Sequence, residues 1–232
     1  MPDAFGGGAW AFAVGYVVVV AVHAFSFARA RGFSLRPAHF AERHRLLLII
    51  ALGETIIAIG GGASRRLAEW PVVLAVVLAM VLISALWWIF FVGDHHEDGE
   101  RALAGTTPEA RAERARWAYS VAYLVVIAGL VATAAGLHAV VHEPTHRLDL
   151  AGSITLAGGV VAFLLGIVLF LRVLRVGSWM EPAVGAAVCS VTVLPGLWVN
   201  ALVQLAGLAV VLIAVAAIRA RTRETPHADL DA

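Results

Sequence analysis

The feature that most constrains this chain is a series of apolar segments, most of them roughly 17–25 residues long, separated by polar connections. A helix needs about 20 apolar residues to cross a bilayer core of roughly 30 Å. Because lipid offers the backbone no hydrogen-bond partner, such segments cross as helices. A transmembrane β-barrel would show shorter stretches of alternating polarity, which the sequence lacks. We therefore predict an all-α, polytopic transmembrane helix bundle.

Seven spans are predicted in one transmembrane domain, residues 1–218, followed by a polar tail, residues 219–232. The sixth span is short and is followed by Pro195-Gly196, so a re-entrant segment is the alternative there. The first span follows an N-terminal stretch without a basic residue, unlike a secretory signal, and is expected to be retained. The predicted spans are Trp10–Ala28, Leu46–Gly62, Pro71–Val92, Trp117–Val141, Ala151–Leu171, Pro182–Leu194 and Leu197–Ile218.

Arginine alone supplies the basic residues, and its distribution predicts the orientation. The first, third and fifth connections and the C-terminal tail hold fourteen arginines, and the other connections hold three. Cytoplasmic loops of membrane proteins carry the excess of basic residues. We therefore predict an N-terminus outside, a cytoplasmic C-terminus and a multi-pass protein of the bacterial inner membrane.

Two polar segments are expected at the cytoplasmic surface. The alternating charges of Glu109, Arg111, Glu113 and Arg116 predict a short solvated helix. The tail after Arg219 is polar and is expected to be disordered.

Several classes of function are disfavoured by composition. The formal net charge is only +1, which argues against nucleic-acid binding. Cys189 is the single cysteine, lies in an apolar segment and is expected to be a small buried side chain. No catalytic signature of a soluble enzyme stands out, so neither an enzyme nor a cofactor is predicted.

The most informative polar residue is Glu54, in the second predicted span. It lies eight residues beyond Leu46, about 12 Å into the apolar segment and near the bilayer midplane. An acidic side chain at that depth costs on the order of 2.5–3.5 kcal/mol on insertion scales. It must therefore face protein or water, and the neighbouring Gly53 would let another helix approach closely.

Glu54 belongs to a stripe that reaches the cytoplasmic interface. Glu42, Leu46, Ile50 and Glu54 recur every four residues and form one slowly drifting face of a helix. The two carboxyl-bearing residues are about 18 Å apart along the axis. The functional interpretation is a proton, cation or substrate path, and the structural alternative is a protonated Glu54 bonded to another helix, with Glu42 paired to a neighbouring arginine. The candidate residues are His39, Glu42, Arg43, Gly53 and Glu54.

Other polar residues fall inside the predicted spans. Asn200 and Gln204 are spaced i, i+4 and are expected to hydrogen-bond between helices. His23 and His138 are possible partners of Glu54, and the sequence does not pair them.

Two clusters suggest metal ligands, although a structural explanation is favoured for each. His138, His142 and His146 repeat at i+4 beside Glu143, a spacing that can bind zinc. Pro144 is expected to end the helix before the last of them. The segment Asp94–Asp98 is expected to be a flexible loop, which rarely forms a closed site, so no metal is predicted.

The segment around Trp87, Trp88, Phe90 and Phe91 is typical of an interfacial aromatic belt. Together with the segments His39-Phe-Ala-Glu42-Arg43 and Leu52-Gly53-Glu54, it resembles the bacterial low-temperature-requirement A (LtrA) family. That family shows an H-x-x-E-R segment followed about ten residues later by L-G-E. A phenylalanine stands at position 90 where the family pattern has tyrosine.

The resemblance covers most of the chain and implies a cell-membrane protein tied to growth in the cold, without a defined biochemical activity. Members of the family usually begin with further spans that carry a Glu-Leu-Phe-Phe-Asp-type segment. We expect this chain to match only the rear part of the family pattern, as a fragment, a mis-assigned start or a short form.

Three functions remain open from the sequence. The first is transport of protons or a small ion, with Glu54 at the midplane, Glu42 and His39 as the cytoplasmic relay, and Arg43 orienting them. The second is a non-transporting membrane protein of cold or envelope stress, in which the stripe packs against a partner membrane subunit or another copy in a homo-oligomer. The third is an intramembrane enzyme acting on lipid.

Overall fold

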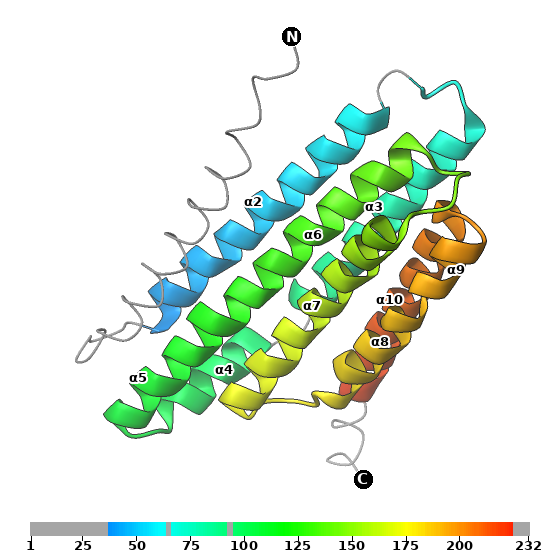
Figure 1. Cartoon of the computed structure of the whole chain (residues 1–232). Coiled ribbons are helices and arrows are strands. Elements are labelled where there is room, and N and C mark those ends of the chain that lie inside the picture. The colour runs from blue at the N-terminus through cyan, green and yellow to red at the C-terminus, as the bar shows by residue number, and fades with distance from the viewer. Residues whose placement is uncertain (1–36, 64–65, 92–94, 225–232) are drawn as a thin grey trace. The chain divides into compact units, whose positions relative to one another are not determined.

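The computed structural model describes residues 37–63, 66–91 and 95–224, and this part of the chain is helical apart from short connections, without any strand. The chain divides into two compact units, Met1–Leu35 and Arg36–Ala232, of which only the second carries described helices (Figure 1). The predicted all-α class is confirmed. The helices are α2 (Pro37–Ala63), α3 (Trp70–Phe91), α4 (His95–Ala104), α5 (Pro108–Arg116), η1 (Trp117–Ala122), α6 (Tyr123–His142), α7 (Leu150–Leu174), α8 (Met180–Val191), α9 (Val193–Trp198) and α10 (Ala201–Glu224).

Six helical stretches in the described part are long and apolar enough to cross a membrane. Each corresponds to one predicted span, and the remaining predicted span, Trp10–Ala28, lies outside the described residues. Large apolar side chains such as Ile57 and Val210 are exposed on the surface of the bundle, which suits contact with lipid. The protein is therefore a multi-pass membrane protein. The six stretches are Arg45–Ala63, Trp70–Phe91, Glu113–His142, Leu150–Leu174, Met180–Trp198 and Ala201–Arg221.

The connections between spans alternate between two ends of the bundle (Figure 1). One end holds α4, α5, the α7–α8 connection and the end of α10, and we call it the arginine-rich end because most of the described arginines lie in these segments. The opposite end holds the α2–α3 and α6–α7 connections and α9. Backbone amides join its segments: Leu148 donates to the carbonyl of Gly196 at 3.1 Å, and Ala201 donates to that of His146 at 2.9 Å.

The closest helix pair is α6 and α7, and glycines make this closeness possible. Gly129 and Gly136 on α6, and Gly159 and Gly166 on α7, are each separated by two helical turns and so share one face. A Cβ atom at any of the four would lie within 3 Å of backbone atoms of the other helix. Packing of small residues substitutes for the hydrophobic effect between helices in lipid.

The α5 segment differs from the predicted separate surface helix. It continues through the π-helical turn η1 into α6, so Glu113–His142 forms one helical stretch. The sequence contains no proline between Pro108 and Pro144 that would interrupt it. The wider turn of η1 shifts the helix face, as single π-helical turns commonly do. The solvated helix and the span are thus one continuous element.

The segment Asp94–Asp98 was expected to be a flexible loop, and this is wrong for His95–Asp98, which begin α4. The C-terminus of α4 is held by Arg111 of α5. Its guanidinium donates to the carbonyls of Leu103 and Ala104, both at 2.9 Å, and to that of Thr106 at 3.0 Å. A cation at a helix C-terminus satisfies unpaired carbonyls and complements the helix dipole. Arg111 therefore stabilises the C-terminal end of α4.

The sixth predicted span crosses fully, as α8 and α9 together. The helix breaks at Thr192, whose hydroxyl donates to the carbonyl of Cys189 at 2.7 Å. Pro195 explains the break, because it lacks an N–H and its ring crowds the carbonyl four residues earlier. The span then continues to Trp198 at the opposite end, so the re-entrant alternative is not adopted. Cys189 is fully buried, as predicted.

Asn200 and Gln204 have different roles. The Asn200 side chain accepts a hydrogen bond from the amide of Val203 at 2.9 Å and caps α10, so the prediction of an interhelical bond is wrong for this residue. It is confirmed for Gln204, which is fully buried and bonds to Ser153 of α7. The prediction of a disordered tail is wrong for its first residues, because α10 continues to Glu224. Arginine favours helix, and Arg219 is buried against the bundle.

The aromatic belt is confirmed for the two tryptophans only. Trp87 and Trp88 are 43% and 45% exposed near the arginine-rich end of α3. Phe90 is instead buried and packs edge-on against Tyr123, with ring centroids 5.5 Å apart. It therefore belongs to the core.

Candidate functional site

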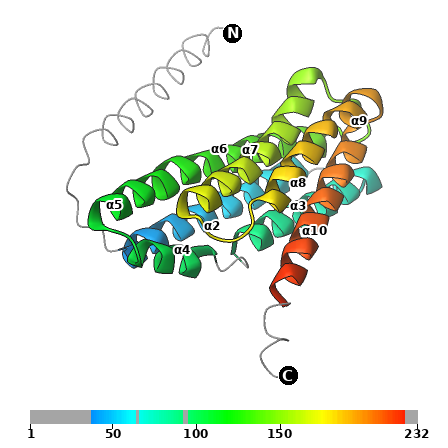
Figure 2. The same cartoon turned by 90° about the horizontal axis from the view of Figure 1, so that it is seen from below.

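The candidate site lies on α2, which packs on α6 and α3 through one narrow face (Figure 2). The buried side chains on that face recur at helical spacing, so the rest of the helix surface is left to other contacts. Thr55 is the polar residue among them, and its hydroxyl donates to the carbonyl of Ala51 at 2.8 Å. The buried residues are Leu48, Leu52, Thr55, Ile59 and Ala63.

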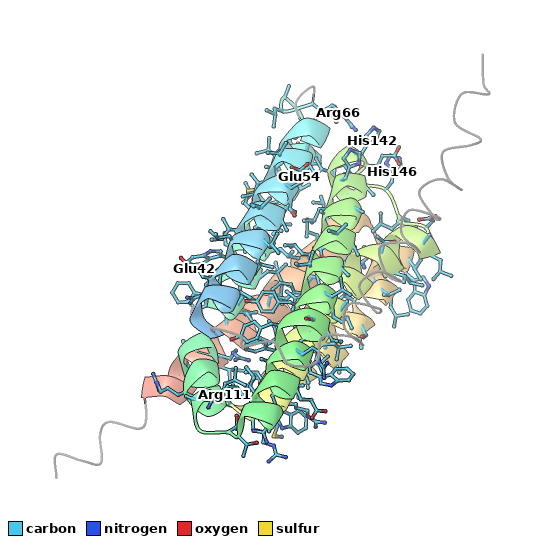
Figure 3. The ribbon with its side chains drawn as sticks, turned by 90° about the vertical axis from the view of Figure 1, so that its left-hand side faces the viewer. Glu42, Glu54, Arg66, Arg111, His142 and His146 are labelled. Atoms are coloured by element: carbon cyan, nitrogen blue, oxygen red, sulfur yellow. The ribbon has the colours of Figure 1, made fainter. Side chains whose placement is uncertain are left out.

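Glu54 lies on the face of α2 that points away from this packing surface and is exposed (Figure 3). It stands nine residues from either end of the apolar stretch Arg45–Ala63, about 13 Å from each. Its neighbours on the same face, Ile50 and Ile57, are 67% and 68% exposed. Among the described residues, its carboxylate has no hydrogen bond or ion pair. A lone carboxyl therefore sits at mid-depth on an otherwise apolar surface.

The predicted stripe is present and faces outward over its whole length. Glu42, Leu46, Ile50 and Glu54 are all exposed, so the four residues share one face of α2. Glu42 lies toward the arginine-rich end and Glu54 toward the middle of the span (Figure 3). The side chains of His39 and Arg43, the other predicted members, lie outside the described side chains.

No helix in the described part of the chain packs against the glycines near Glu54. A Cβ atom at Gly53 or Gly60 would meet nothing within 4 Å, in contrast to the glycines between α6 and α7. These two glycines are two helical turns apart and lie on the outer half of α2. The expected close approach of a helix at Gly53 is thus not made by any helix in the described part of the chain.

The interior of the bundle is apolar and aromatic next to α2. Tyr119 and Tyr123 stack with centroids 5.8 Å apart, and Phe170 packs edge-on against both rings. Phe90 and Phe163 extend this cluster. These rings belong to the core, whereas Glu54 is exposed on the outer face of α2, so its carboxyl does not line a passage between the described helices.

Charged residues join α2 to its neighbours at the opposite end. The Arg66 guanidinium donates to the Glu69 carboxylate at 2.7 and 2.8 Å, and also to the backbone carbonyl of His142 (Figure 3). The hydrogen bond from Arg66 lowers the pKa of Glu69 below its ordinary value. The same bond, with the charge of Glu143, raises the pKa of Arg66. Sequence reasoning missed this corner, because it counted Arg66 only toward orientation.

The three histidines of the first suggested metal cluster, His138, His142 and His146, do not converge. α6 ends at His142, so Pro144 stops the helix before His146, as predicted. The rings of His138 and His142 have centroids 6.5 Å apart on the exposed side of α6. Among the described side chains, no three His, Cys, Asp or Glu groups are placed to hold a metal ion, and the side chains of His95–Asp98 lie outside them. His23, a possible partner of Glu54, lies outside the described residues.

Comparison with known proteins settles the family. The family model described as bacterial low temperature requirement A protein (LtrA) matches residues 26–217, which include α2 with its exposed stripe. The chain belongs to the LtrA family. An uncharacterised protein of Rhizobium meliloti (strain 1021) is 27% identical to this chain over 135 residues. That match covers 58% of this chain and 32% of the relative. No solved structure matches this LtrA protein significantly.

Proposed function

We propose that this LtrA protein moves protons or a small cation across the bacterial inner membrane, with Glu54 taking up and releasing the charge. The observation that supports this most is the mid-depth position of the carboxyl on an apolar helix face. A carboxyl there costs on the order of 2.5–3.5 kcal/mol on insertion scales, and such groups commonly serve ion pathways or proton relays. The proposal assigns no enzymatic step to the chain.

The path in this proposal runs along the outer face of α2 rather than through the bundle. The aromatic cluster around Tyr123 lies in the core, whereas Leu46, Ile50 and Glu54 are exposed on the outer face of α2. A second copy or another membrane subunit that covers this face would enclose the path and shield Glu54 from lipid. His39 and Glu42 would pass the charge at the arginine-rich end, and Arg43 would orient them.

The test is flux in liposomes that contain the purified full chain. An imposed pH gradient or membrane potential should drive a flux in the parent. Glu54→Gln should abolish this flux, because a glutamine amide does not take up and release protons near neutral pH. Glu54→Asp, which keeps the carboxyl, should retain part of it. Glu113→Gln removes an exposed carboxyl at the arginine-rich end and should leave the flux unchanged. Equal flux in the parent and Glu54→Gln would reject the proposal.

A second candidate function is favoured by Gly53 and Gly60, whose surroundings are open to a docking helix. In that case the chain is a non-transporting subunit of the cold or envelope stress response, and the face of α2 serves assembly. It predicts that Gly53→Leu abolishes crosslinking to the partner, whereas Glu54→Gln does not alter growth in the cold. The transport proposal predicts that Glu54→Gln impairs cold growth while the complex remains assembled.

A further inference from the structure

A second surface feature is an apolar groove of about 400 Å³ between α8 and α10. These helices lie side by side in both views (Figures 1 and 2). Val184, Val188 and Val210 line the groove and are 60%, 45% and 66% exposed, so it opens toward lipid. Gly185 deepens it, because a Cβ atom there would approach a side-chain carbon of Val215 at 2.6 Å.

The length of the groove suits one leaflet. Its lining runs from Met180 to Val188 on α8, about 12 Å at 1.5 Å per residue. Half of a bilayer core is about 15 Å. The groove thus begins at the arginine-rich end and covers most of the depth of the adjoining leaflet.

Glu181 stands at the mouth of this groove, one residue inside the span Met180–Trp198. Its Oε2 atom has almost no exposed surface and no hydrogen-bond partner in the described part of the chain. An unpaired carboxylate oxygen is unfavourable when buried, and because the residue itself is partly exposed, a donor from outside the described residues can reach this carboxyl group. The donor must reach the headgroup level of the membrane.

Basic and aromatic side chains flank the same position. The Arg172 guanidinium lies over the ring of Trp179, 3.6 Å from its centroid, immediately before α8. Arg175 is exposed in the same connection. Tryptophan is enriched at headgroup depth, and arginine binds phosphate through paired N–H groups. The mouth therefore offers an acceptor for a cation and donors for an anion.

We propose that the α8–α10 groove binds an aminophospholipid of the ethanolamine type, with one acyl chain between the helices. Its primary ammonium donates to Glu181, and its phosphate accepts from Arg172 or Arg175. A quaternary choline headgroup has no N–H to donate, and a glycerol headgroup has no positive charge. A second copy of this chain docked in the groove is the alternative occupant, and it would show no headgroup preference. The proposal is independent of the transport proposal.

The test is competition among three lipids with identical acyl chains and ethanolamine, choline or glycerol headgroups. Native mass spectrometry of the full chain in mild detergent counts the lipids retained. We expect the parent to keep the ethanolamine lipid several-fold more than the others. Glu181→Gln should reduce this preference to less than twofold, whereas Glu113→Gln should keep it, because it removes a carboxylate elsewhere on the arginine-rich end.

A second pair of variants tests the groove itself. Val188→Trp fills the groove from an exposed position and should lower retention of all three lipids several-fold. Val191→Trp enlarges an exposed side chain on the same helix outside the groove, and should have little effect. A parent without headgroup preference, a preference unchanged in Glu181→Gln, or a Val188→Trp variant that alters only the oligomeric state would each overturn the proposal.

Discussion

Ser153 of α7 and Gln204 of α10 exchange two hydrogen bonds across the bundle, 51 residues apart in sequence. The Ser153 hydroxyl donates to Gln204 Oε1 at 2.8 Å, and Gln204 Nε2 donates to the Ser153 carbonyl at 2.9 Å. Both side chains are fully buried, and Gly196 of α9 leaves the room that they occupy. The pair therefore joins α7 and α10 and packs against α9 near the opposite end.

We expect Gln204→Leu to lower the stability of the bundle, because it leaves Ser153 without its side-chain partner. Hydrogen bonds between transmembrane helices contribute about 0.6 kcal/mol on average and up to about 1.7 kcal/mol. A double-mutant cycle with Ser153→Ala, read by unfolding in detergent, should give a coupling energy in that range. Additive effects of the two substitutions would contradict this interpretation.

The spans were predictable from the sequence because insertion into lipid depends on the composition of a short window, which is a local property. The face of α2 that packs on the bundle was not predictable from the sequence. Leu46 and Ile50 are exposed whereas Leu48 and Leu52 are buried, and the four side chains have similar hydrophobicity. In lipid both faces of a helix are apolar, so periodicity does not reveal which one meets the bundle. The stripe through Glu54 was therefore correctly grouped, while its outward direction needed coordinates.

The same limit applies to the glycines. Gly53 and Gly60 on α2 have the same seven-residue spacing as Gly129 and Gly136 on α6, yet within the described part of the chain only the second pair contacts another helix. Contact depends on the partner that tertiary structure supplies, and spacing alone does not specify it.

Adjacent glycines on α7 give a direct test of this packing. We expect Gly159→Ala to lower the free energy of unfolding by about 1–3 kcal/mol, because the added methyl would overlap the backbone at Thr133. Gly158→Ala is the matched control, since its Cβ would meet only a side-chain carbon of Ile154 at 3.9 Å. It should be neutral or stabilising by up to about 1 kcal/mol. Equal losses for the two variants would argue against a close α6–α7 contact.

The Arg66–Glu69 pair predicts a pH dependence of stability. Arg66 lowers the pKa of Glu69 in the folded state, so the pair stabilises the fold above the ordinary value of 4.5. That stabilisation is lost as the pH falls through the lowered pKa. The raised pKa of Arg66 also stabilises the fold, and this contribution is lost only at strongly alkaline pH and is constant below it.

Unfolding of the parent and Glu69→Gln in detergent, followed from pH 7 to acid, measures this effect. The parent should be slightly more stable at neutral pH, and the difference should disappear in acid and shrink with salt, because both groups are exposed. Glu143→Gln should change the profile less, since Glu143 acts on Arg66 without a hydrogen bond. A difference between parent and Glu69→Gln that persists in acid would have another origin.

Replacing Arg111 should locally destabilise α4 at the arginine-rich end. Its three hydrogen bonds to carbonyls at and just beyond the C-terminus of α4 depend on the planar guanidinium, which offers several N–H donors at fixed angles. Arg111→Ala should lower the opening free energy of α4 by about 1 kcal/mol, seen as faster hydrogen exchange of its amides. Arg111→Lys should restore only part of the protection. Arg114→Ala removes the same charge from the same helix and should leave α4 unchanged, whereas an equal effect would mean that net charge, rather than these hydrogen bonds, holds the corner.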